Sequence, residues 1–282
     1  MSQFKNTVAV ITGGASGIGK SLAIALTEAG ASVAIADVNL AQANELASSL
    51  GVNARAYLCD VTERSQIEAL AGSVMKDLGK VNFVFANAGV AIAGSVLTTS
   101  PTEFDWLVDV NVRGVFSTIQ VFVPFLIDSA KDGNPARFII TGSENSLGVP
   151  KTGASSVYTM TKHATLALAD TLRRDVAQTG VKVSIFCPGV VDTKLYDARR
   201  TRQARYGGQS AMPQEFVERA SAVMAQGQDP AVTAELCLRG VSNDEFLIIT
   251  DPKIRDFAST RIAETEQALS TVDTALASKV NQ

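Results

Sequence analysis

Tyr158 and Lys162 stand four residues apart in a segment typical of a helix, so their side chains project from the same face. A phenol in water titrates at about pH 10, which is too high for efficient proton exchange at neutral pH. A neighbouring ammonium favours the phenolate, so we expect Lys162 to lower the pKa of Tyr158. The pair is a candidate proton donor and acceptor. By its spacing alone, it also fits a solvated surface pair.

A glycine-rich segment, Thr12–Gly19, lies between a predicted strand and a predicted helix. The preceding run, Thr7–Ile11, is apolar and rich in β-branched residues, as in a strand buried on both faces of a parallel sheet. From Ile18 to Ala29 apolar residues recur at helical spacing. Glycines at such a turn let the backbone approach a ligand, and the helix N-terminus attracts phosphate. The segment predicts a pyrophosphate site, with a tight turn that binds no ligand as the alternative.

Asp37 ends the second predicted strand, Ser32–Ala36. A carboxylate about 20 residues beyond such a glycine turn can hydrogen-bond the hydroxyls of a cofactor ribose. It would repel a 2′-phosphate, and residue 38 is valine, so no adjacent Arg or Lys compensates that charge. These features favour NAD over NADP. A purely structural role of Asp37 at the start of the next turn stays open.

Strands and helices alternate along the rest of the chain, which predicts a doubly wound parallel sheet in an α/β fold. In such sheets ligands bind beyond the carboxyl ends of the strands, where Asp60, Asn87 and Ser143 also fall. The further strands are predicted at Ala54–Leu58, Asn82–Ala86, Arg137–Thr141, Lys182–Phe186 and Phe246–Ile249. The further helices are predicted at 39–50, 62–78, 100–130 and 213–224, and one that carries Tyr158 follows the loop 144–156 and runs to about Thr179.

Asn111 lies in an apolar part of the long helix predicted from Ser100 to about Ala130. A buried amide needs hydrogen-bond partners, and a bond to the backbone of a distorted turn would satisfy it and expose a carbonyl to water. A purely structural asparagine is the alternative.

Composition and charge exclude several classes of function. The chain of 282 residues is 46% hydrophobic and has a formal net charge of −3, and no polybasic run indicates binding to nucleic acid or to a membrane surface. Cys59, Cys187 and Cys237 are widely spaced in apolar segments, which indicates reduced core thiols rather than disulfides, and no ligand cluster predicts a metal site. We expect one cytoplasmic domain spanning residues 1–282, without a signal peptide or membrane span.

Together these residues resemble the short-chain dehydrogenase/reductase family, in its compact Rossmann branch, over roughly residues 5–195. The resemblance implies a three-layer doubly wound Rossmann fold with a seven-stranded parallel sheet. The matching motifs are TGGASGIG at 12–19, Asp37, Asp60, NAG at 87–89, Asn111, Ser143, YTMTK at 158–162 and PGVVDT at 188–193.

By this resemblance the chain would be an NAD-dependent enzyme that interconverts a secondary alcohol and a ketone. Tyr158 would be the general acid/base, Lys162 would hold the nicotinamide ribose, Ser143 would bind the substrate oxygen and Asn111 would support a water in a proton relay. Asp60 resembles the adenine contact, Asn87 the ribose-side contact and Thr193 the carboxamide contact. The other implied coenzyme residues are Gly13, Ser16, Gly17, Ile18, Gly19, Asp37, Val61, Ala88, Gly89, Pro188, Gly189 and Val191.

Ser143 and Ser146 are the two candidates for the family's serine. Ser143 lies farther from Tyr158, and Ser146 slightly nearer, than the family's serine does. Ser143 is preferred because it directly follows a strand, which puts extra loop residues near Thr152–Ala154.

Two segments depart from the family pattern. Residues 194–229 correspond to a substrate lid, whose arginines 199, 200, 202 and 205 either bind an anionic substrate or form a solvated surface. Aromatic and apolar lid residues predict a roomy apolar pocket for a bulky, hydrophobic or aryl substrate: Leu195, Tyr196, Tyr206, Met212 and Phe216. Residues 251–282 predict one or two amphipathic helices that pack on the lid or on a neighbouring subunit, or are partly mobile.

We expect a homodimer or homotetramer, with a dimer contact through the Ser100 and Tyr158 helices. Two other functions stay open at this point. One is an NADPH-preferring carbonyl reductase, and the other is a dinucleotide-binding sensor or scaffold without turnover.

Overall fold

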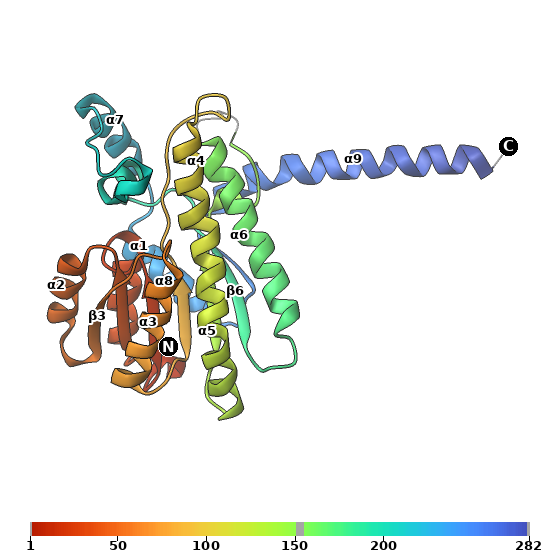
Figure 1. Ribbon diagram of the computed structural model, residues 1–282. Coiled ribbons are helices and arrows are strands. Elements are labelled where there is room, and N and C mark those ends of the chain that lie inside the picture. The colour runs from red at the N-terminus through yellow and green to blue at the C-terminus, as the bar shows by residue number, and fades with distance from the viewer. Residues whose placement is uncertain (1, 151–154, 281–282) are drawn as a thin grey trace.

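The computed structural model describes residues 2–150 and 155–280. Its centre is a sheet of seven parallel strands in the order β3-β2-β1-β4-β5-β6-β7, flanked by helices (Figure 1). The predicted Rossmann-like α/β fold is therefore confirmed. The strands are β1 (Val8–Thr12), β2 (Ser32–Asp37), β3 (Ala54–Leu58), β4 (Phe83–Ala86), β5 (Arg137–Thr141), β6 (Lys182–Cys187) and β7 (Leu247–Ile249).

The two faces of the sheet carry separate hydrophobic cores, because alternate residues of a strand point to opposite faces. In β1, Val8 and Val10 belong to one core, and Ala9 and Ile11 to the other. The helices α3 (Arg64–Leu78), α5 (Gly114–Lys131) and α6 (Ser156–Asp175) contribute to the first core, and α1 (Gly17–Glu28), α2 (Leu40–Leu50) and α8 (Pro230–Ser242) to the second.

The helix α8 was not predicted, although its start carries clear signals. Asp229 accepts a hydrogen bond from the Ala231 amide, and Pro230 occupies the first helical position. Another difference is that α6 ends at Asp175 rather than near Thr179.

The long predicted helix begins as expected, with the Ser100 side chain accepting from the Glu103 amide. It consists of α4 (Pro101–Val108), a π-helical turn η3 (Asp109–Arg113) and α5. By length and composition alone, Pro101–Lys131 is the one helical stretch among the described residues that could cross a membrane. In the fold, Trp106 and Phe122 of this stretch are fully buried in the protein core.

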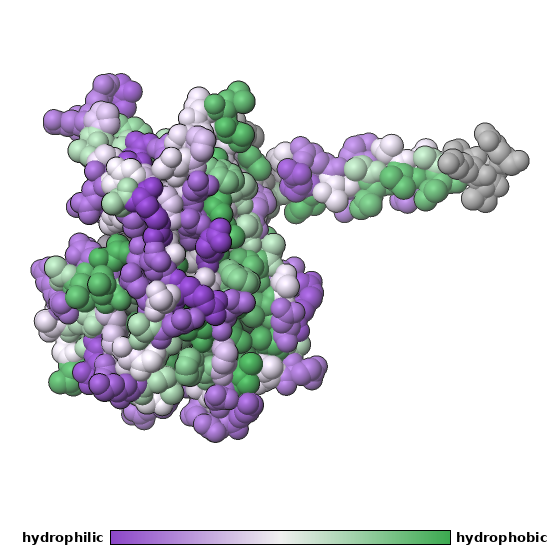
Figure 2. All heavy atoms as spheres, viewed as in Figure 1, coloured by the Kyte–Doolittle hydropathy of each residue, from purple (hydrophilic) through white to green (hydrophobic). Residues whose placement is uncertain are grey.

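The two departing segments are both helical. The lid contains two short 3₁₀ turns, η5 (Lys194–Thr201) and η6 (Ala204–Tyr206), and then α7 (Gln214–Met224). The C-terminal segment forms one helix, α9 (Arg255–Val280), which extends away from the body (Figure 1). One expectation was that this segment packs on the lid, and it does not (Figure 1). Its apolar residues are exposed, as Figure 2 also shows: Ile262, Leu269, Val272 and Leu276.

Candidate active site

The glycine turn is held together by close backbone packing at the carboxyl ends of β1 and β4. A Cβ on Gly19 would lie 2.1 Å from the Gly13 carbonyl oxygen and 2.7 Å from Asn87 Nδ2. Asn87 Nδ2 donates to the carbonyls of Thr12 and Gly13, both at 3.1 Å. The Asn87 amide, expected on the ribose side, therefore braces the turn from within the protein.

The loop after β6 lies against the same turn. Gly13 and Gly17 have φ values of +62° and +51°, which favour glycine. A Cβ on Gly17 would lie 3.1 Å from Thr193 Cγ2, and one on Gly13 would lie 2.8 Å from Ala88 Cα. The structure thus brings together the glycine turn, the NAG segment and the PGVVDT segment.

The remaining predicted coenzyme residues lie in the loops that follow the strands and at the start of α1. Ser16 is the N-cap of α1, with Ile18 in the first turn of the helix. A Cβ on Gly89 would lie 3.6 Å from Lys162 Nζ, which places this glycine beside the candidate catalytic residues. The others contact segments that are distant in the sequence. Val61 packs against Gly114, and Gly189 packs against Asp251. The Pro188 carbonyl accepts a hydrogen bond from the Glu144 amide, and Val191 forms a β-bridge with Gln228.

Asp37 is buried and accepts two backbone hydrogen bonds. Its Oδ2 accepts from the Ala15 amide at 3.0 Å and its Oδ1 from the Asn39 amide at 2.9 Å. The carboxylate thus joins the glycine turn to the start of α2. Each carboxylate oxygen can accept a further bond, so this structural role leaves acceptor capacity for a hydroxyl donor.

Asp60 is held by residues on both sides. Its Oδ1 accepts from the amide and hydroxyl of Thr62, at 3.0 and 2.6 Å, and its Oδ2 accepts from Gln203 Nε2 at 2.9 Å. Gln203 belongs to the lid and was not predicted as a site residue. No local motif marks it, because its partner is 143 positions away in the chain.

Tyr158 and Ser143 meet at the end of β5. The Ser143 hydroxyl hydrogen-bonds the phenol oxygen, and this bond favours the phenolate. Burial has the larger effect and raises the pKa of Tyr158 to about 12. The pKa of Tyr158 is therefore raised and not lowered as expected, because desolvation of the phenolate dominates.

Lys162 is fully enclosed and bonds to the backbone of β5. Its Nζ donates to the Thr141 carbonyl at 2.8 Å and lies 5.6 Å from the centre of the Tyr158 ring. Burial lowers the pKa of Lys162 to about 8, because a buried ammonium loses its hydration. The two side chains share one helix face as predicted.

Asn111 lies in the π-helical turn η3, which agrees with the expected distortion. Its side chain does not bond to its own turn, however. Its Oδ1 accepts from the Val90 amide and its Nδ2 donates to the Val90 carbonyl, both at 2.9 Å. Nδ2 also donates to Thr161 Oγ1 at 3.0 Å, and Thr161 donates to the Tyr158 carbonyl. Asn111 therefore connects the NAG loop to the helix of Tyr158.

The geometry favours Ser143 over Ser146. The Ser146 hydroxyl accepts from the Ser143 amide at 3.1 Å and bonds to the buried Cys187 thiol, so it points into the protein. Asn145, which was not predicted, donates through Nδ2 to Thr159 Oγ1 at 3.1 Å and through its backbone amide to Ser143 Oγ at 3.2 Å. The predicted loop insertion at Thr152–Ala154 lies outside the described residues.

The four lid arginines bond to other lid residues and to the body of the protein. Neither predicted role, an anionic-substrate site or a solvated surface, includes these contacts. Three are paired with carboxylates of the body: Arg199 and Arg202 with Glu103, and Arg205 with Glu63. The other partners are the carbonyls of Lys194 and Asp197 for Arg200, the Gly208 carbonyl for Arg202, and the Thr62 hydroxyl for Arg205.

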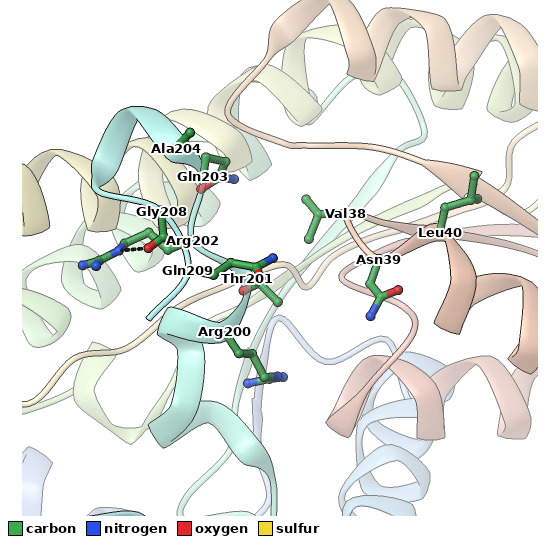
Figure 3. Close-up of a pocket in the computed structure, with 10 residues that line it drawn as sticks. All are labelled: Val38, Asn39, Leu40, Arg200, Thr201, Arg202, Gln203, Ala204, Gly208 and Gln209. Atoms are coloured by element: carbon green, nitrogen blue, oxygen red, sulfur yellow. Dashed lines mark hydrogen bonds between the residues drawn. The ribbon is translucent and has the colours of Figure 1, made fainter. Parts of the chain in front are cut away.

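A cavity of about 600 Å³ opens between the lid and the loop after β2 (Figure 3). It is lined by Val38, Asn39, Leu40, residues 200–204, Gly208 and Gln209. None of the five predicted lid residues lines it, and Tyr206 is instead buried, with its hydroxyl donating to Asp109 Oδ2 at 2.6 Å. Arg200 lines the same cavity as Val38. The fold therefore places the Arg200 guanidinium near the loop that follows Asp37, although the two residues are far apart in the sequence.

The family follows from comparison with known proteins. The model of the short chain dehydrogenase family matches residues 7–204. The chain belongs to the short-chain dehydrogenase/reductase family. The chain is 30% identical to the C alpha-dehydrogenase of Sphingobium sp. strain SYK-6, over 91% of this chain and 84% of that protein.

Two further relatives extend the comparison. The chain is 38% identical to the 1-deoxy-11-beta-hydroxypentalenate dehydrogenase of Streptomyces avermitilis, over 67% of this chain and 70% of that protein. Its fold matches the crystal structure of a short-chain dehydrogenase/reductase from Burkholderia phymatum in complex with NAD, with a TM-score of 0.83 and 28% identity over 96% of this chain and 97% of that one. The chain is thus an oxidoreductase by family.

Proposed function

We propose that this short-chain dehydrogenase/reductase interconverts a secondary alcohol and a ketone with NAD as coenzyme. The observation that carries the proposal is the hydrogen-bonded pair Ser143 and Tyr158, which lies at the same edge of the sheet as the glycine turn. The two curated relatives above are named as dehydrogenases, which supports the oxidative direction.

The glycine turn suits a dinucleotide. Its backbone is closely packed at Gly13 and Gly19 and leads into the N-terminus of α1, where amide groups and the helix dipole favour a pyrophosphate. When bound, NAD supplies the atom that accepts or donates the hydride. The protein then has to bind the coenzyme, orient the alcohol and move one proton.

Tyr158 would move that proton. In oxidation its phenolate oxygen takes the proton as the alcohol O–H bond breaks and the carbinol hydrogen leaves as hydride. In reduction the phenol returns the proton to the oxygen of the ketone. Ser143 donates to the same oxygen as negative charge develops on it. When Lys162 is protonated, its ammonium, bonded to the Thr141 carbonyl, places a positive charge near the Tyr158 ring.

The preference for NAD rests on the Asp37 carboxylate, which would oppose a 2′-phosphate. Arg200 favours the second candidate, an NADPH-dependent carbonyl reductase, because its guanidinium lines the cavity beside the loop after Asp37. Arg200 Nη1 also donates to two carbonyls of its own lid segment, at 2.7 and 2.8 Å, so this nitrogen already has partners within the protein. We expect Asp37 to dominate.

A comparison of the two coenzymes tests this preference. We expect a KM for NAD at least roughly tenfold lower than that for NADP, since a like charge held near a phosphate costs on the order of 1 kcal/mol or more. Asp37→Ser should narrow the gap and Arg200→Ala should widen it. A lower KM for NADP in the unmodified protein would reverse the assignment.

The substrate is proposed to be hydrophobic and bulky, with an aryl or alicyclic group. Leu195, Tyr196, Met212 and Phe216 are only partly buried in the lid, which supports an apolar contact surface there. A screen of secondary alcohols followed by NADH absorbance would identify the class. Turnover confined to small polar alcohols would contradict this part of the proposal.

We also propose that the protein forms a homodimer or homotetramer. Large apolar side chains are exposed on the helices named for the dimer contact: Phe104 on α4, Phe116 on α5 and Met160 on α6. Sedimentation at micromolar concentration should give a mass above that of one chain, and a purely monomeric species would contradict this.

A further inference from the structure

One lid side chain links the loop after β3 to α4. Gln203 Nε2 donates to Asp60 Oδ2 at 2.9 Å, and Gln203 Oε1 accepts from Trp106 Nε1 at 3.0 Å. An indole N–H can only donate, so it requires the amide oxygen of Gln203 and leaves the NH₂ group to face the carboxylate. The orientation of the Gln203 amide is thus fixed by one partner that donates a hydrogen bond, Trp106, and one that accepts, Asp60.

These contacts fix the orientation of the Asp60 carboxylate and leave one of its oxygens able to accept another hydrogen bond. Oδ1 already accepts two hydrogen bonds from Thr62, whereas Oδ2 accepts one, from Gln203. A carboxylate oxygen can accept two, so Oδ2 retains capacity for one more donor such as an exocyclic amine. Without the Gln203 bond, the carboxylate would keep its anchor at Thr62 but could rotate its second oxygen.

The cavity lies where an adenosine would be expected to bind. One wall is the loop 38–40, which follows Asp37 at the end of β2, and the other is the lid segment 200–209, which contains Gln203 (Figure 3). Its volume of about 600 Å³ falls in the range of small-molecule sites. Asp37 and Asp60 follow the neighbouring strands β2 and β3, so the cavity is close to both carboxylates.

We propose that the lid segment 199–210 closes over the adenosine half of the coenzyme, and that Gln203 is a positioning residue that orients Asp60 toward the adenine amine. The proposal rests on the dinucleotide binding argued above. It gives the lid a second task besides contact with the substrate, since the same amide reaches Trp106 on α4.

The segment has other anchors that do not depend on Gln203. The Tyr206 hydroxyl donates to Asp109 Oδ2 at 2.6 Å, and Arg205 is paired with Glu63 and Thr62. Arg199 is paired with Glu103. A substitution of Gln203 alone should therefore leave the segment in place, so that its effect on Asp60 can be measured.

The test compares ligands that contain the adenosine half with one that lacks it. In Gln203→Ala, we expect the Kd for ADP-ribose and for NADH to rise roughly tenfold, because a charge-assisted bond that orients Asp60 is lost. Turnover with reduced nicotinamide mononucleotide should stay unchanged. Gln203→Glu should weaken ADP-ribose binding further, because it places a second carboxylate beside Asp60.

Arg199→Ala is the matched control, since it removes another anchor of the same segment, the ion pair with Glu103, while Gln203 and Thr62 stay in place. It should retain the affinity for ADP-ribose.

Three results would overturn the proposal. An equal loss of affinity in Arg199→Ala, or an equal loss of activity with nicotinamide mononucleotide in Gln203→Ala, would assign the effect to general loosening of the lid. Unchanged ADP-ribose binding in Gln203→Ala would show that Gln203 does not position Asp60. Failure of the unmodified protein to bind NADH or NADPH would instead overturn the proposed function.

Discussion

Tyr158→Phe is expected to reduce turnover by on the order of 10³-fold or more while NADH binding stays nearly intact. The substitution removes the one hydroxyl that moves the proton, and general acid–base catalysis contributes about 10²–10⁴-fold. The ring itself is retained, so the packing of this buried side chain changes little. Steady-state rates and NADH fluorescence titration measure the two quantities. Turnover equal to that of the unmodified protein would exclude Tyr158 as the acid/base.

The pH dependence of the unmodified protein provides an independent control. Because the pKa of Tyr158 is raised to about 12, the phenol holds its proton at neutral pH. Oxidation requires the phenolate, so its rate should increase with pH through the alkaline range, whereas reduction requires the phenol and should not increase. The residual activity of Tyr158→Phe should lack the alkaline rise. A rise that persists in that variant would point to another titrating group.

Gly19→Ala is expected to abolish coenzyme binding, with at least a roughly 100-fold increase in the Kd for NADH. The new methyl group would sit 2.1 Å from the Gly13 carbonyl oxygen and 2.7 Å from Asn87 Nδ2, so the turn and its asparagine brace must both move. Overpacking of this kind costs about 1–3 kcal/mol of folding stability or more. Titration with NADH and thermal unfolding would report the two effects.

Gly72→Ala is the matched control for this change. Gly72 lies in α3, and a Cβ there would meet no atom within 4 Å. Alanine is favoured over glycine in a helix interior by about 1 kcal/mol, so this variant should be as stable as the unmodified protein or more stable. Unchanged NADH binding in Gly19→Ala would show that the turn does not contact the coenzyme.

The sequence predicts the parts of the site that depend on local patterns. Strands such as β1, β2 and β4 are short apolar runs that end in or are followed by a polar residue. The turn at Gly13–Gly19 has its glycines where positive φ or close packing requires them. Tyr158 and Lys162 share a helix face because four residues are about one helical turn. In each case the signal lies within a few neighbouring positions.

Properties that depend on the surroundings could not be predicted in this way. The pKa of Tyr158 depends on its burial by several elements, and desolvation reverses the direction expected from the Lys162 spacing. Gln203 and Arg200 become relevant only because the lid folds back toward Asp60 and Val38, far away in the sequence. The partners of Asn111 lie on two other segments, so the amide alone suggested only that some partner must exist.

The π-helical turn at Asp109–Arg113 changes how this helix would respond to a change in chain length. A π turn contains one residue more than the corresponding α-helical turn, so the loss of a single residue there would be absorbed as regular helix. The helices α4 and α5 would then keep their relative orientation, and Trp106 would stay beside Gln203. The effect would fall on the turn itself, where Asn111 bonds to the Val90 backbone. A one-residue deletion elsewhere in α4 or α5 would instead rotate the residues on either side by about 100° relative to each other, and should be tolerated less well.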